Sequence, residues 1–102
     1  MKDPYFAVVQ EQWSNILMLY RHVADKKPVM LFDIQEQRIY AYPYEEFKAE
    51  LNERSQTILT EQYEDALENQ KIVIFVRDNV KRKLVSYTFA AEDTEANQGA
   101  VL

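Results

Sequence analysis

The chain has 102 residues and a net charge of −5, with 47% hydrophobic and 28% charged residues. This is ordinary usage for one globular domain and excludes a disordered chain. The absence of cysteine excludes disulfides, thiolate metal sites and cysteine nucleophiles. The first residues contain no apolar signal-peptide core, and no stretch is long enough to span a bilayer, so we expect a soluble cytoplasmic protein.

Asp3 and Pro4 are typical of a helix start, because the carboxylate accepts free amides of the first turn and proline needs no hydrogen bond there. Apolar residues at helical spacing follow, which predicts a helix over residues 4–25 that ends before Pro28. Residues 29–34 and 38–42 are rich in strand formers and are joined by a polar link, so they predict a β-hairpin.

Residues 44–70 are acidic and helical in composition, but their apolar residues fall into two phases about 130° apart. One straight helix cannot bury both sets against one surface, so we expect two helices with a break near residues 54–60. Residues 71–77 and 84–90 predict a second hairpin, and the polar residues 91–102 predict a mobile tail.

The order helix, hairpin, helical segment, hairpin predicts a single α+β domain over residues 1–90. We expect two layers in an αββαββ-type arrangement, with a four-stranded, mostly antiparallel sheet made of two hairpins packed on helices. The sequence does not determine the strand order. Each half has a helix before two strands, which is compatible with a duplicated αββ unit or with chance.

Residues that would support catalysis are scarce. The only glycine, Gly99, lies near the end of the chain, so no glycine-rich phosphate loop exists. His22 is the only histidine, is expected on the solvent face of the first helix, and cannot alone form a metal site or serve a serine nucleophile. Carboxylate pairs such as Glu46 and Glu50 fit a magnesium ion or, more simply, a solvated acidic helix face. We therefore predict no enzyme, no cofactor and no metal.

The charge is unevenly distributed, since residues 34–70 carry nine acidic residues against three basic ones and residues 71–89 carry five basic against one acidic. The basic hairpin loop 77–83 predicts, as the alternative function, a nucleic-acid-binding regulator that combines cations with aromatic stacking. The acidic remainder of the chain weighs against nucleic acid. A solvated turn is the simpler interpretation. The candidate contacts are Arg77, Lys81, Arg82 and Lys83.

Both faces of the predicted sheet are apolar, because Ile72, Ile74 and Val76 alternate with Val73 and Phe75. A sheet with two apolar faces needs a second cover, which is either the split helical segment or another protein chain. The leading hypothesis is a small non-enzymatic interaction or assembly module, self-associating as a homodimer or acting as an accessory subunit. The candidate partner-binding residues are Trp13, Tyr20, Phe32, Tyr40, Tyr42, Phe75 and Tyr87.

Overall fold

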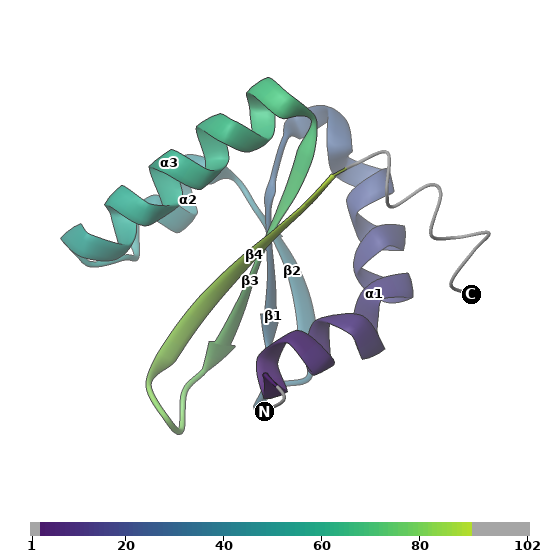
Figure 1. The fold of residues 1–102 in the computed structure, drawn as a ribbon, viewed down its shortest axis with the longest axis vertical. Helices are drawn as coiled ribbons and strands as arrows, with labels where there is room; N and C mark the ends of the chain where they lie inside the picture. Colours follow the sequence, from purple (N-terminus) through teal and green to yellow (C-terminus); the bar gives the residue numbers. More distant parts are fainter. Residues whose placement is uncertain (1–2, 91–102) are drawn as a thin grey trace.

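The computed structural model describes residues 3–90 (Figure 1). The elements in chain order are α1 (Pro4–Val23), the 3-10 helix η1 (Ala24–Lys26), β1 (Val29–Asp33), β2 (Arg38–Tyr42), α2 (Tyr44–Ala49), α3 (Glu53–Asn69), β3 (Lys71–Asp78) and β4 (Lys83–Ala90). The predicted tail, residues 91–102, lies outside the described residues.

Helix α1 begins as its sequence predicts. The Asp3 carboxylate accepts hydrogen bonds from the backbone N–H groups of Tyr5, at 2.9 Å, and Phe6, at 3.2 Å. Pro4 occupies the first turn, where its missing N–H costs nothing. The helix ends at Val23, and the 3-10 helix η1 that follows it ends where Lys27 adopts a left-handed conformation and donates its N–H to the Ala24 carbonyl at 2.9 Å. The predicted range is thus confirmed to within a few residues.

The acidic middle segment forms two helices, as predicted, but the break lies at residues 50–52 rather than 54–60. The carboxamide oxygen of Asn52 accepts the N–H of Ser55 at 2.9 Å and so starts α3. The β-branched residues near 57 stay inside α3, where the Thr57 hydroxyl donates to the Glu53 carbonyl at 3.2 Å. The cap at Asn52 therefore decides the position of the break, and β-branching does not.

The four strands form one sheet in the order β2-β1-β3-β4. Each hairpin is antiparallel, and the two hairpins join through β1 and β3, which run parallel in the centre. The α+β class and the mostly antiparallel sheet of two hairpins are confirmed. The second strand of each hairpin, β2 and β4, lies at an edge of the sheet.

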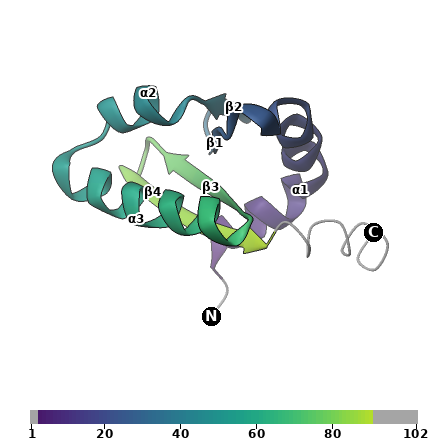
Figure 2. The ribbon, with the colours of Figure 1, turned by 90° about the horizontal axis from the view of Figure 1, so that it is seen from above.

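Helices cover both faces of the sheet, which makes three layers instead of the expected two (Figures 1 and 2). Alternate strand residues point to opposite faces. The core under α1 includes Val9, Ile16, Leu17, Met30, Ile74 and Val76. The core under α2 and α3 includes Leu31, Phe47, Leu59, Val73 and Phe75. The second cover required by a sheet with two apolar faces is therefore the split helical segment of the same chain.

The two halves of the chain repeat the same local geometry. In each half a helix ends at a left-handed residue, Lys27 or Gln70, before a central strand. A four-residue link then joins that strand to an edge strand, and its last residue, Gln37 or Arg82, is also left-handed. Because β1 and β3 are parallel and the helices cover opposite faces, the arrangement is that of two αββ units related by an approximate twofold axis between these strands.

Candidate functional site

The turn between β3 and β4 is organised by Asp78, the last residue of β3. One oxygen of this carboxylate accepts the backbone N–H groups of Val80 and Lys81, both at 3.1 Å, and the side-chain amide of Gln35 at 2.9 Å. The other oxygen accepts the Tyr5 hydroxyl at 2.8 Å. The Lys81 N–H and the Tyr5 hydroxyl lower the pKa of Asp78 to about 2, against an ordinary value of 3.8. Asp78 thus joins α1, the β1–β2 link and the basic turn between β3 and β4.

Arg77 does not take part in a free basic cluster. Its Nε donates to the carboxylate of Asp33 at 2.9 Å, and the side chain of Asp33 is only 1% exposed. Burial raises the pKa of Asp33, but the Glu36 N–H and the Arg77 guanidinium outweigh that effect, so the pKa is lowered overall. Arg77 is one of the four cations predicted to contact nucleic acid, and it is instead paired with Asp33 inside the protein. Lys81, Arg82 and Lys83 remain exposed at the turn and the start of β4.

Strand β4 presents the longer of the two sheet edges, with eight residues against five in β2. Residues 84–90 contain no charged residue, proline or glycine. Both edge strands begin at a basic residue, Arg38 in β2 and Lys83 in β4, but only β2 is followed at once by a proline, Pro43, a residue type that discourages strand pairing. Alternate residues of an edge strand direct their N–H and C=O groups outward. Among the described residues, no other strand pairs with the outer edge of β4.

Helix α1 supports β4 from one face. The ring centroids of Trp13 and Phe89 lie 4.8 Å apart, and those of Phe6 and Tyr87 lie 5.4 Å apart. The Tyr87 hydroxyl donates to the capping carboxylate of Asp3 at 2.7 Å. Burial and this hydrogen bond raise the pKa of Tyr87 to about 12. One face of β4 is thus held against α1. The outer edge of the strand is not paired with another described strand.

The predicted partner-binding residues do not form one surface. Trp13 and Tyr87 belong to the core under α1, whereas Tyr40, Tyr42 and Phe75 belong to the core under α2 and α3. Phe32 and Phe75 are buried, with 4% and 3% of their surface exposed. The remaining residue, Tyr20, lines a pocket. Most of these aromatic rings are therefore committed to internal packing, and they are not gathered on an exposed sheet face.

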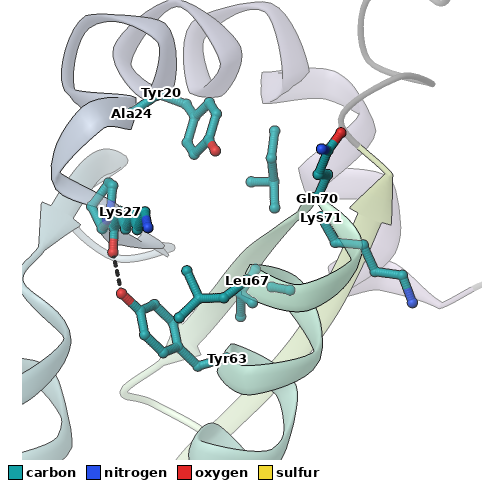
Figure 3. Close-up of a pocket in the computed structure, with 11 residues that line it drawn as sticks. Tyr20, Ala24, Lys27, Tyr63, Leu67, Gln70 and Lys71 are labelled. Carbon is teal, nitrogen blue, oxygen red and sulfur yellow. Dashed lines mark hydrogen bonds between the residues drawn. The ribbon is translucent and has the colours of Figure 1, made fainter.

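A pocket of about 320 Å³ lies between the C-terminal ends of α1 and α3 (Figure 3). Its walls include Tyr20 and Ala24 on the α1 side and Tyr63 and Leu67 on α3. The Tyr63 hydroxyl donates to the Lys27 carbonyl at 2.6 Å and so ties the two helix ends together. Burial raises the pKa of Tyr20. The walls are largely apolar, and they contain no arrangement of an acid, a base and a nucleophile.

Within residues 3–90, no three histidine or carboxylate side chains lie close enough to hold a metal ion together. Over the same part of the chain, no helix combines the length and apolar character needed to cross a bilayer. Comparison of the chain with protein-family models, with curated proteins and with solved structures finds no match.

Sequence reasoning missed two features of the hairpin end. It did not identify the buried carboxylates of Asp33 and Asp78, although both stand at the end of an apolar strand before a polar link. That pattern was the available signal for a turn-organising acid. It also did not identify β4 as an edge strand. Which strands lie at the edges depends on the strand order, and that order is set by the pairing of β1 with β3, whose residues are 44 positions apart in the sequence.

Proposed function

We propose that this protein is a small non-enzymatic interaction module that binds an extended protein segment along the outer edge of β4. The observation that carries the proposal is the eight-residue edge strand, whose residues 84–90 are uncharged. Long uncharged edges present unpaired backbone groups to another strand, and addition of a strand to a sheet edge is a common mode of protein recognition.

The covered sheet faces favour an edge over a face as the binding surface. Helices of the same chain pack on both faces, so a partner is not needed to bury either of them. The described residues with large exposed apolar side chains are scattered, and they are Met18, Ile58, Leu67 and Val80. Isolated exposed residues of this kind are normal on a protein surface. Backbone pairing along β4 does not require an apolar patch.

The proposal is tested by selecting peptides from a random displayed library at low protein concentration and measuring their affinity. We expect extended, uncharged peptides that slow hydrogen exchange at β4 amides. The variant Ser86→Lys/Thr88→Lys places two charges on the edge strand and is expected to abolish binding. The control Gln10→Lys/Ser14→Lys adds the same charge on the exposed side of α1 and is expected to retain it. Equal binding by both variants would overturn the proposal.

Nucleic-acid binding is the competing outcome. Three exposed cations remain at the turn, namely Lys81, Arg82 and Lys83, while Arg77 is paired with Asp33. The aromatic residues that would stack on bases lie partly or wholly inside the two cores, and they are Tyr40, Tyr42, Phe75, Tyr87 and Phe89. Retention of single-stranded oligonucleotides at low salt, lost on changing the three cations to alanine, would favour this alternative.

A further inference from the structure

We infer that the pocket between the C-terminal ends of α1 and α3 binds a small monocarboxylate with an apolar body (Figure 3). The pocket volume is about 320 Å³, at the lower end of the roughly 300–1,000 Å³ typical of small-molecule sites. Its described lining residues lie on α1, η1, α3, β3 and the links between them, and none of these residues belongs to β4. The inference therefore does not depend on the proposed use of the β4 edge.

The apolar part of the wall contacts the body of the ligand. Ala66, Ile72 and Val73 line the pocket and are buried core residues, so they form its floor. Leu67 lines it as well and is 46% exposed, which makes it one of the four large apolar side chains left exposed in the described part of the chain. A hydrocarbon or aromatic body placed against these residues removes apolar surface from water on both sides. The wall thus favours a ligand with an apolar body.

The Tyr20 hydroxyl supplies a hydrogen-bond donor. The side chain projects from α1, and its hydroxyl points into the pocket (Figure 3). The Tyr63 hydroxyl already donates to the Lys27 carbonyl, whereas the Tyr20 hydroxyl has no hydrogen-bond partner among residues 3–90. Burial raises the pKa of Tyr20, so the hydroxyl keeps its proton at neutral pH. It can therefore donate to an acceptor group of the ligand.

The charges around the pocket favour an anion. The described lining residues include two lysines, Lys27 and Lys71, and no carboxylate. Lys71 is paired with Asp65 at 2.9 Å, whereas no described carboxylate lies within ion-pair distance of Lys27. The flexible stem of a lysine lets its ammonium follow a bound anion. A carboxylate accepts hydrogen bonds from both an ammonium and a hydroxyl, and charge-assisted bonds are the stronger kind. A carboxylate with an apolar body therefore uses every part of this wall.

Octanoate is the probe that tests this inference. It is titrated into the isotope-labelled full chain, and binding is followed by NMR chemical shifts. We expect saturable shifts at amides of residues 20–27 and 63–73, with a dissociation constant between micromolar and millimolar. Octylammonium has the same apolar chain and the opposite charge, and it is expected to give no saturable shift at these amides. Butyrate has a shorter apolar chain and is expected to bind more weakly than octanoate.

Two single substitutions test the polar contacts. Tyr20→Phe keeps the ring and removes the hydroxyl, and Lys27→Gln removes the cation. Each is expected to weaken octanoate binding about threefold to tenfold. Lys26→Gln changes the neighbouring exposed lysine, which does not line the pocket, and is expected to retain the wild-type affinity. Urea unfolding of each variant checks that the fold is retained.

A third substitution tests the apolar contact. Leu67→Gln places a polar group on the exposed wall and is expected to weaken octanoate binding, with no such effect for Met18→Gln on the exposed side of α1.

Three results contradict the inference. Absence of saturable shifts at the pocket amides excludes a carboxylate ligand of this kind. Equal binding of octylammonium shows that charge does not select the ligand. Equal effects of Lys27→Gln and Lys26→Gln, or of Leu67→Gln and Met18→Gln, place the binding outside the pocket. Peptide binding at the β4 edge is measured separately, so its success or failure is distinguishable from each of these results.

Discussion

Asp33 and Asp78 occupy the same position in the two hairpins, where each is the last residue of a central strand and lies opposite a basic residue, Arg38 or Lys83. Both aspartates are buried, with 1% and 7% of their surface exposed. Each accepts backbone N–H groups of the link that follows it. Asn79 donates to Asp33 at 3.1 Å, and Gln35 donates to Asp78 at 2.9 Å, so each hairpin link supports the carboxylate of the other.

The low pKa of Asp78 predicts an acid-sensitive fold. Its pKa of about 2 in the folded protein lies below the ordinary 3.8, so the native state favours the carboxylate. That contribution to stability is complete above about pH 4 and is lost as the pH falls towards 2. Urea unfolding across this range is expected to show a falling midpoint. Asp78→Asn is expected to be less stable at pH 7 and to show a shallower fall.

Asp25→Asn changes an exposed carboxylate in η1 and is the control for this experiment. It is expected to follow the wild-type pH profile. An Asp78→Asn variant with the full wild-type acid response would mean that Asp78 does not contribute to the pH dependence.

The Arg77–Asp33 ion pair is expected to matter more than the other ion pair of the described residues. Arg77→Ala leaves the buried Asp33 carboxylate without its cation and is expected to cost about 1–3 kcal/mol. This is less than for a fully buried pair, because the Arg77 side chain is 29% exposed. In the pair of Lys71 with Asp65 the side chains are 34% and 43% exposed, so Lys71→Ala is expected to cost less than about 1 kcal/mol. Equal costs in chemical denaturation would contradict the structural role of Arg77.

Enclosure of the sheet on both faces predicts that both cores are needed for stability. Ile16→Ala removes a fully buried side chain under α1, and Phe47→Ala removes one under α2. Each is expected to lower the free energy of unfolding by about 2–5 kcal/mol. Met18→Ala, at a position 69% exposed, is expected to change it by less than about 0.5 kcal/mol. A small effect of Phe47→Ala would indicate that the second cover is loosely packed.

The four left-handed residues predict a stabilising substitution. Gln70 has φ of 54° at the end of α3, where a side chain bearing a Cβ is strained and glycine is not. Gln70→Gly is expected to stabilise the protein by about 0.5–1 kcal/mol, measured by thermal or urea unfolding. Asn69→Gly, one residue earlier in the helix, is the matched control and is expected to destabilise it. Stabilisation by both substitutions would argue against the left-handed conformation as the cause.

Local signals in the sequence determined most of the secondary structure. Asp3 and Pro4 start α1, and the apolar runs of β1 and β3 are strands, because capping and side-chain alternation act over a few residues. The two apolar phases of residues 44–70 required two helices. Their boundary was misplaced because one Asn52 cap decided it, and a phase change marks only the neighbourhood of a break.

Only the tertiary structure decided the strand order, the three layers and the exposed edge. The parallel pairing of β1 with β3 joins residues about forty-four positions apart, and no local pattern specifies it. That pairing places β4 at an edge and turns the two helical regions to opposite faces. It also brings Asp33 beside Arg77, because parallel strands end on the same side of a sheet. The sequence identified two apolar sheet faces and a basic turn. The pairing of distant strands determined that both faces are covered by helices and that the edge of β4 and the basic turn are exposed.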